Sequence, residues 1–304
     1  MPVEHPALCN LNPLLAAAER GGYAVGAFSP RYTAMIQPVL QAGQALNSPL
    51  IVQISQRELT RAQITPARFA SAFYTEMQTG QITVPVALHL DHTRELSIIE
   101  EAIAAGFTSV MIDASERPFA ENIAITRQVV AYAHRHGVSV EAELGRITTT
   151  DYVETEDDAE MFTDPEEAGV FVAETGVDAL AVSVGTAHGV YVVRQPRIDY
   201  NRLQAIRART AVHLVLHGGS GVPAAMVEQA ISLPGGGVSK VNIATELELA
   251  ALGALGRSHY LLDTEMSALP VEALLAARQA VSGVVQDKIQ NFLHSSGKAG
   301  KVKS

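Results

Sequence analysis

The sequence has little or none of several features that indicate particular classes of function. Its single cysteine, Cys9, cannot close an internal disulfide, and no apolar run reaches the roughly 18 residues that a membrane span needs. Basic residues are in the minority, with 22 Lys and Arg against 32 Asp and Glu. The resulting formal charge of -10 argues against nucleic acid or an anionic membrane as the main partner, since both attract basic surfaces.

The start of the chain also lacks the basic residues and long apolar run of a secretory signal, so we expect a cytoplasmic protein. In contrast, 47% of the 304 residues are hydrophobic and only 18% are charged, which is enough to bury a large core.

Short apolar runs alternate with amphipathic segments along the chain. The runs are rich in Val, Ile and Leu and rarely alternate with polar residues, which is typical of strands buried on both faces. Eight strand–helix units in 304 residues predict an α/β fold, a (β/α)8 TIM barrel. A doubly wound open sheet is the alternative, but no GxGxxG follows the first run. The runs are 23–28, 50–54, 84–90, 109–113, 138–144, 179–184, 213–216 and 240–243.

We expect one barrel domain over residues 1–304. Helical patterns in 246–293 follow the eighth strand and predict a C-terminal helical extension, and the Lys- and Gly-containing 295–304 predicts a flexible tail. The longest gap between strands contains the acidic stretch 148–164. Such a loop is either a lid over the site or a solvated surface segment.

Polar residues crowd the C-terminal ends of the predicted strands, where barrel enzymes place their active sites. Asp91 and His92 end the third strand, and His188 and His217 follow the sixth and seventh. Each histidine alone would be an ordinary core or rim residue. Three imidazoles on one rim predict a Zn²⁺-like ion with a position left for a substrate oxygen, and Asp91 places an acid beside it. His89 lies inside its strand, and we expect it to point into the barrel or orient a neighbour.

Glycine and small polar residues follow strands six to eight. Backbone N–H groups in such turns bind phosphate in many barrels, so a sugar phosphate is the natural substrate. Glycines that serve only to make tight turns are the alternative. The residues are Gly189, Gly218, Gly219, Ser220, Asn242, Ile243, Ala244 and Thr245.

Lysine is scarce, and only Lys240 falls in the predicted barrel, at the start of the eighth strand. A lysine that forms a Schiff base at the catalytic face is therefore not expected. Activation of a substrate carbonyl would have to come from a metal.

Five segments form an ordered series of motifs from the third strand to the eighth. They are His-Leu-Asp-His at 89–92, Glu-Ala-Glu-Leu-Gly at 141–145, Val-Gly-Thr-Ala-His-Gly-Val-Tyr at 184–191, Leu-His-Gly-Gly-Ser-Gly at 216–221 and Lys-Val-Asn-Ile-Ala-Thr at 240–245. This series resembles the motifs of the class II, metal-dependent ketose-bisphosphate aldolases of the fructose- and tagatose-bisphosphate type. The resemblance implies reversible cleavage of a ketose (bis)phosphate, or a related phosphorylated ketose, into dihydroxyacetone phosphate and an aldehyde.

The resemblance also implies a role for each matching residue. His92, His188 and His217 correspond to the zinc ligands, and Asp91 to the acid that moves the C4 hydroxyl proton. Asp113 and Glu143 match carboxylates that hold the metal in a second, buried position.

Further positions match the family's substrate site. Ser55 resembles a serine near the substrate, and Arg278 an arginine that reaches the far phosphate, sometimes across subunits. The glycine-rich turns would hold dihydroxyacetone phosphate, with Na⁺ or K⁺ nearby. Family members are homodimers or homotetramers.

The chain departs from the family pattern at three places. After Gly145 the family has a Gly-Gly turn and two acids on a mobile loop, one of which protonates the enediolate; here Asp151 or Glu154 would have to take that role. Ser29 replaces a common asparagine, and Thr93 a common glycine. All three lie near the aldehyde half, so the aldehyde and the stereochemistry are left open.

Two other functions fit the same barrel. A metal-dependent isomerase or epimerase of sugar phosphates uses a similar enediolate without breaking a carbon–carbon bond. A non-catalytic partner subunit of an aldolase would keep the barrel without needing the metal residues, and the presence of all three histidines and Asp91 argues against it.

Overall fold

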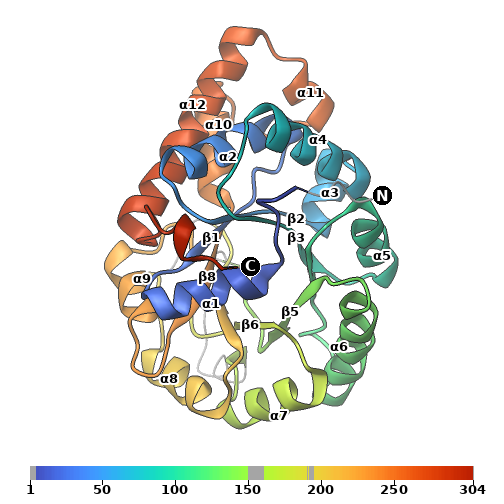
Figure 1. The fold of residues 1–304 in the computed structure, drawn as a ribbon, viewed down its shortest axis with the longest axis vertical. Helices are drawn as coiled ribbons and strands as arrows, with labels where there is room; N and C mark the ends of the chain where they lie inside the picture. Colours follow the sequence, from blue (N-terminus) through green and yellow to red (C-terminus); the bar gives the residue numbers. More distant parts are fainter. Residues whose placement is uncertain (1–4, 150–160, 190, 192–194, 304) are drawn as a thin grey trace.

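The computed structural model describes residues 5–149, 161–189, 191 and 195–303. Eight parallel strands close into a barrel in chain order, and β8 pairs with β1 (Figure 1). The predicted (β/α)8 barrel is therefore confirmed, and the open sheet is wrong. The strands are β1 Val25–Phe28, β2 Leu50–Ser55, β3 Val86–Thr93, β4 Ser109–Ile112, β5 Ser139–Leu144, β6 Ala179–Val182, β7 His213–Leu216 and β8 Val238–Ile243.

Helices surround the barrel and cover the outer face of its strands. Several begin at residues that cap a helix, as at Thr65 and Asp164, whose side chains accept N–H groups of the first turn. The α-helices are α1 Leu11–Gly21, α2 Ile36–Ala45, α3 Gln56–Ala62, α4 Pro66–Thr79, α5 Leu96–Ala105, α6 Phe119–His134, α7 Pro165–Thr175, α8 Tyr200–Arg209, α9 Ala224–Ile231, α10 Thr245–Ala254, α11 Asp263–Ser267 and α12 Val271–Asp287. Shorter helical turns are η1 Thr33–Met35, η3 Lys288–Phe292 and η4 Ala299–Lys301. No helix in these ranges is long and apolar enough to cross a membrane.

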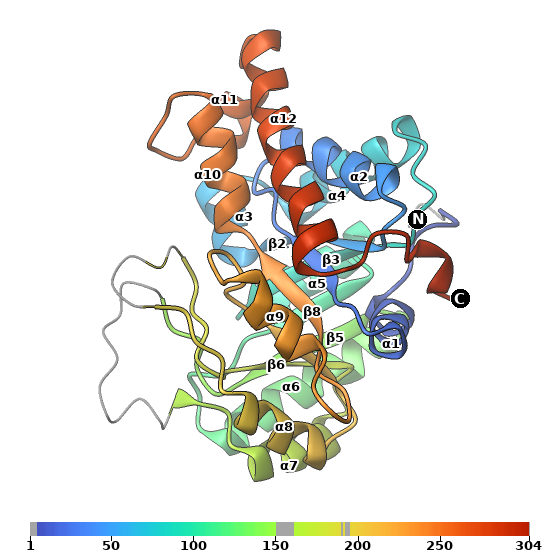
Figure 2. The ribbon, with the colours of Figure 1, turned by 90° about the vertical axis from the view of Figure 1, so that its left-hand side faces the viewer.

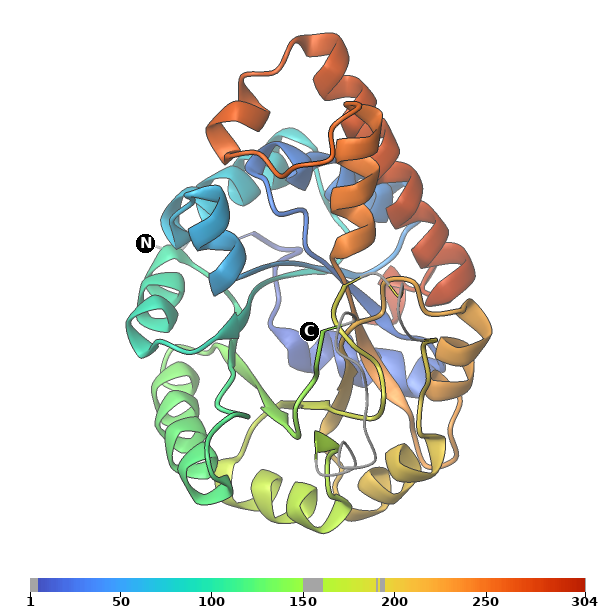
Figure 3. The ribbon, with the colours of Figure 1, turned by 180° about the vertical axis from the view of Figure 1, so that it is seen from behind.

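The two ends of the barrel differ. Helix α1 closes the N-terminal end, where its buried Leu11, Leu14 and Leu15 pack against interior residues of the strands such as Ala87 and Val215. Figure 2 shows α1 and the end of the chain on one side of the barrel, with the described parts of the segments after β5 and β6 (residues 145–149, 161–164 and 183–189) on the other. Seen from behind in Figure 3, these segments lie at the C-terminal end of the barrel.

The segment after β8 packs on one edge of the barrel. Helix α12 lies against α10 and α2, and the helices from α10 to α12 extend beyond the ring of barrel helices (Figure 1). The predicted flexible tail makes several contacts with the barrel in the described residues 295–303. Gly297 and Ala299 donate backbone N–H bonds to Leu46 O and Asn47 O, at 2.9 and 3.0 Å, and Val302 packs against the α1 cluster. Composition alone could not reveal these acceptors at the end of α2.

Candidate active site

The local structure of β3 explains how His92 reaches the barrel mouth. The pairing of β3 with β4 shifts register between Leu90 and Thr93, and His92 has a φ of 29°, which is uncommon for a residue with a side chain. A bulge of this kind redirects a side chain, and strained backbone tends to occur at functional sites. The strand therefore aims His92 into the opening instead of continuing its regular alternation.

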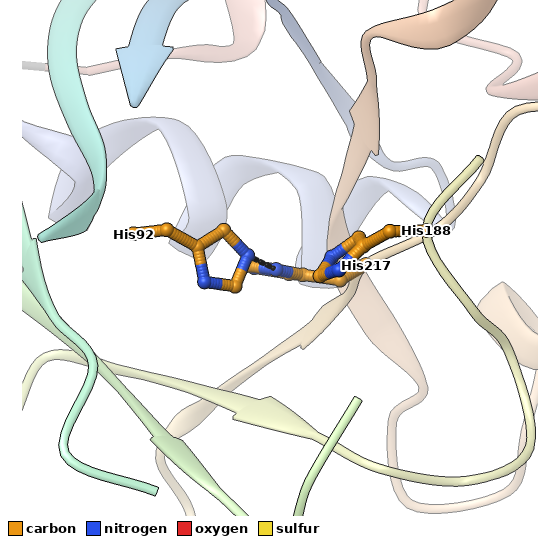
Figure 4. Close-up of side chains that lie close together, drawn as sticks. All are labelled: His92, His188 and His217. Atoms are coloured by element: carbon orange, nitrogen blue, oxygen red, sulfur yellow. Dashed lines mark hydrogen bonds between the residues drawn. The ribbon is translucent and has the colours of Figure 1, made fainter. Parts of the chain in front are cut away.

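Three histidines from different strand ends meet there. Figure 4 shows the imidazole of His92 pointing toward those of His188 and His217. Ring centroids lie 4.8 Å apart for His92 and His188 and 4.6 Å apart for His92 and His217. One nitrogen from each ring falls in a group whose atoms all lie within 4.8 Å of one another. The structure thus brings together the three predicted ligands.

The donor atoms fit a divalent metal of the zinc type. Nδ1 of His217 is 2.7 Å from Nε2 of His92. Nε2 of His188 is buried and has no hydrogen-bond partner among the described residues. A buried nitrogen without a partner costs free energy unless something binds it. Three imidazoles facing one point, one of them unsatisfied, match the ligand set that borderline metals prefer.

Carboxylates fix the protonation of His92. Its Nδ1 is 3.1 Å from Oδ2 of Asp113 and 3.8 Å from Oε2 of Glu143. Burial by itself would lower the pKa of His92, but the charge of Asp91 and the bond to Asp113, with Glu143, outweigh burial and raise the pKa to about 10. The pKa of His188 lies well below its usual range, because of burial and then the charge on His92. The trio therefore carries its positive charge on His92.

Asp113 and Glu143 are held in opposite protonation states. Burial favours the neutral form of both, yet hydrogen bonds from His92 and Ser115 keep the pKa of Asp113 well below its usual value. Burial, followed by the charge of Asp113, raises the pKa of Glu143 to about 8. With His92, these two carboxylates form a second group with metal-ligand spacing, at the residues for which the resemblance implies an alternative metal position.

Asp91 lies beside the histidines and is held by two side-chain amides. Nδ2 of Asn242 donates to its Oδ1 at 3.2 Å, and Nε2 of Gln53 donates to its Oδ2 at 3.4 Å. Burial raises the pKa of Asp91, although the charge of His92 opposes the change. A buried, oriented carboxylate of raised pKa suits a group that accepts and returns a proton.

Lys240 is placed differently from our expectation. Strand β8 begins at Val238, so Lys240 lies within the strand and points into the barrel, fully buried. Its Nζ is 2.8 Å from Oε2 of Glu141 and 2.8 Å from Oδ1 of Asn242. The sequence did contain a signal, since Lys240 and Asn242 are two apart on one strand and therefore share a face. His89 points into the same interior, as expected, with Nδ1 2.8 Å from Oγ of Ser109.

The glycine-rich turn after β7 lies against the start of α10. Gly218 has a φ of 66°, and a Cβ there would be 2.2 Å from the carbonyl oxygen of Ala187, so only glycine fits. The N–H of Gly219 donates to Asn242 O at 3.1 Å, and the N–H of Gly221 donates to a carboxylate oxygen of Glu246 at 2.6 Å. An acidic group thus already occupies part of the turn that we expected to bind phosphate.

The remaining predicted residues are less directly connected to the histidines. The Ser55 hydroxyl accepts the N–H of Glu58 at 3.2 Å and caps α3, a helix that the sequence pattern did not predict. Arg278 donates to Ala34 O at 3.0 Å and to Oε1 of Gln37 at 2.7 Å, so its guanidinium lies against η1 and α2. Asp151 and Glu154 lie outside the described residues.

Comparisons with known proteins identify the family of the chain. The family model for class-II fructose-bisphosphate aldolase matches residues 9–298. A fructose-bisphosphate aldolase of Staphylococcus aureus (strain Mu50) is 40% identical over 294 residues, which cover 94% of this chain and 97% of that protein.

Two solved structures are similar in fold and sequence. The YdjI aldolase of Escherichia coli K12 superposes with a TM-score of 0.80 at 32% identity, covering 96% of this chain and 99% of that one. A putative fructose-1,6-biphosphate aldolase from Coccidioides immitis gives 0.79 at 29% identity, covering 95% and 97%. The chain therefore belongs to the class II fructose-bisphosphate aldolase family, and the predicted metal-dependent aldolase, a lyase that cleaves a phosphorylated ketose into dihydroxyacetone phosphate and an aldehyde, is confirmed.

Proposed function

We propose that His92, His188 and His217 hold a catalytic Zn²⁺ at the barrel mouth, where the ketose is cleaved between C3 and C4. The observation that carries this proposal is the convergence of three imidazole nitrogens, one of which, Nε2 of His188, is buried without a partner in the described part of the chain. When bound, the ion supplies Lewis-acid stabilisation of the negative charge that develops on the substrate oxygens as the bond breaks.

The acid–base work falls to Asp91 in this proposal. Its carboxylate takes the C4 hydroxyl proton during cleavage and returns it during condensation. Asn242 and Gln53 each donate to one of its oxygens, which leaves the remaining lone pairs for the substrate. Because burial raises the pKa of Asp91, its affinity for the transferred proton is higher than that of an exposed aspartate.

We further propose that the phosphate of dihydroxyacetone phosphate binds the turn after β7 and the start of α10. Gly218 allows close approach of the backbone, and the ten-residue helix α10 favours an anion at its N-terminus. The phosphate would replace the Glu246 carboxylate at the N–H of Gly221. The proposed substrate contacts are Ser55, Gly189, Gly218, Gly219, Ser220, Asn242, Ile243, Ala244 and Thr245, with Na⁺ or K⁺ nearby.

Other parts of the proposal come from the family alone. Asp151 or Glu154 would protonate the enediolate carbon, and Arg278 would reach the far phosphate of the substrate in a homodimer or homotetramer. A cytoplasmic location is proposed because phosphorylated sugars are made and consumed there.

The residues of the chain indicate the aldehyde product less clearly than the metal or the acid–base group. Ser29 is buried and accepts from Nε2 of Gln53 at 3.1 Å, and the buried Thr93 donates to Asp91 O at 3.1 Å. Ser29 therefore contacts a residue that holds the Asp91 carboxylate, and Thr93 contacts the backbone of Asp91, at positions where the family commonly has other residues. The names of the S. aureus and C. immitis relatives point to fructose bisphosphate, and we propose a phosphorylated ketose with a related or altered aldehyde half.

The test is a condensation screen. Purified protein is incubated with Zn²⁺, dihydroxyacetone phosphate and a panel of phosphorylated and uncharged aldehydes, and new ketoses are identified by mass and by NMR. A ketose product with at least one aldehyde is expected. Absence of condensation together with absence of C3 proton exchange in dihydroxyacetone phosphate refutes the proposal, and interconversion of ketose phosphates without bond cleavage would indicate an isomerase or epimerase.

A further inference from the structure

The layer of the barrel interior directly beneath the histidines is polar. Gln53, His89, Glu141 and Lys240 each have an exposed fraction of 0%. Barrel interiors are usually filled by branched apolar residues, and each buried charge costs several kcal/mol in lost hydration. A contribution to core stability does not explain this polar layer. Its contacts with the active site could explain it.

One ammonium group links two separate parts of the site. Nζ of Lys240 is 2.8 Å from Oδ1 of Asn242 and 2.8 Å from Oε2 of Glu141. An ammonium only donates, so it binds the amide oxygen of Asn242 and leaves the amide nitrogen for other partners. The side-chain amide of Asn242 is therefore locked in one of its two orientations.

The first connection leads to the acid–base residue. With its oxygen on Lys240, Asn242 turns Nδ2 toward Oδ1 of Asp91, at 3.2 Å. If the amide turned over, an oxygen would face the Asp91 carboxylate, and two acceptors in contact repel. Lys240 thus determines whether Asn242 can hold Asp91 at all.

The second connection leads to a metal ligand. Oε1 of Glu141 is 2.8 Å from Nε2 of His217, while Oε2 of the same carboxylate lies against Lys240. A carboxylate on Nε2 keeps the proton there and leaves Nδ1 of His217 to face His92 and the metal position. One oxygen of Glu141 therefore lies at hydrogen-bond distance from His217, and the other forms an ion pair with Lys240.

We propose that Lys240 is a positioning residue for both halves of the active site: through Asn242 it orients Asp91, and through Glu141 it orients His217. The inference rests on the proposed roles of Asp91 and His217. A second metal in the buried group His89, Asp91 and Glu141 is the competing interpretation. The ammonium already supplies a positive charge at Glu141, which favours the lysine.

The test removes both charges of the Lys240–Glu141 ion pair, so that the contact of Lys240 with Asn242 is lost while the contact of residue 141 with His217 is kept. Lys240→Met alone leaves Glu141 charged and unpaired in the interior, which can unfold the barrel. The double variant Lys240→Met/Glu141→Gln removes both charges, and the glutamine oxygen can still accept from Nε2 of His217. Asn242, however, loses the group that fixes its amide.

In the zinc-loaded double variant, we expect kcat for ketose cleavage to fall about 10- to 100-fold, the range for partners that orient site residues. KM should change little. Exchange of the C3 proton of dihydroxyacetone phosphate should fall less, because the proposed mechanism does not use Asp91 in that step. The single variant Glu141→Gln should weaken Co²⁺ binding, measured by chelator competition, and shift the visible absorption bands of the bound Co²⁺.

Ser239→Ala is the matched control. It lies on the same strand, is buried, and loses one hydrogen bond, to Leu214 O at 3.4 Å, on the opposite face of β8. Its kcat and Co²⁺ spectrum should match those of the wild type. Wild-type cleavage by the folded double variant, or an equal loss of cleavage and exchange, overturns the role of Lys240. Failure of the wild type in both reactions would instead overturn the proposed function.

Discussion

Metal binding should release a proton from His92, and the number of protons released tests the geometry of the histidine trio. Nε2 of His217 faces a carboxylate oxygen of Glu141, so it carries a proton and leaves Nδ1 as an acceptor. Nε2 of His92 must then donate to that Nδ1, while Nδ1 of His92 donates to Asp113. His92 is therefore an imidazolium in the metal-free protein, in agreement with its pKa of about 10.

The sign and size of the effect follow from this arrangement. Below pH 10 a metal must displace the Nε2 proton of His92, so affinity rises with pH. One proton per metal corresponds to about tenfold in Kd per pH unit, or roughly 1.4 kcal/mol, and to about 100-fold between pH 6.5 and 8.5. Glu143, with a pKa of about 8, adds a second proton below that pH if its carboxylate ionises on binding.

The proposed measurement is calorimetry of Zn²⁺ binding in buffers of different ionisation enthalpy, supported by chelator competition across the same pH range. Glu143→Gln removes the second titrating group and should release one proton. Asp113→Asn removes the negative charge beside Nδ1 of His92, which lowers the pKa of that imidazole and should reduce the release at pH 8. A pH-independent Kd with no proton release in Glu143→Gln would show that His92 is not protonated in this way.

Three further substitutions test single residues. His188→Ala removes one of three ligands, so zinc measured by elemental analysis should fall far below one ion per chain; unchanged content would exclude this residue from the site. Asp91→Ala should retain zinc but lower kcat for cleavage by about 10²- to 10⁴-fold, the usual contribution of a general base, and retained turnover would exclude that role. Gly218→Ala should destabilise the fold by about 2 kcal/mol in urea unfolding, because its φ is 66° and its Cβ would contact Ala187 O at 2.2 Å. The control Gly253→Ala, in α10 with open space around the new Cβ, should stabilise by about 0.5–1 kcal/mol; equal effects of the two changes would contradict the steric argument.

The sequence predicted the barrel because its strands are buried on both faces and read as continuous apolar runs. It also predicted the meeting of His92, His188 and His217, since parallel strands of a closed barrel end on one rim. In both cases a periodic pattern and one topological rule were sufficient.

The contacts between side chains inside the barrel could not be predicted from the hydrophobic pattern of the strands. The sequence pattern predicts that Lys240 is the first residue of its strand, whereas the pairing of Leu214 with Val238 shows that β8 begins two residues earlier. The contact between Lys240 and Glu141 joins strands on different sides of the ring, so no local rule predicts it. Helix α3 was missed because it is only seven residues long and follows β2 directly.

The docking of the C-terminal residues and the position of Arg278 depend on acceptors that lie far away in sequence. Ala34 and Gln37 bind Arg278, and Leu46 and Asn47 bind the segment after η3. Hydropathy and composition describe what a segment can cover, whereas single backbone acceptors are visible only in three dimensions.

The pairing of β1 with β8 has a consequence for how the molecule forms. These strands come from opposite ends of the barrel sequence, so the ring stays open at two edges until β8 has left the ribosome. Open strand edges can pair with other chains, and closure over such a long loop is slow. The ion pair of Lys240 with Glu141 joins β8 to β5 across the interior, so it forms only when β8, the last strand, takes its place in the ring. Such late contacts act mainly on the unfolding rate, so the lysine beneath the active site would also slow the reopening of the barrel.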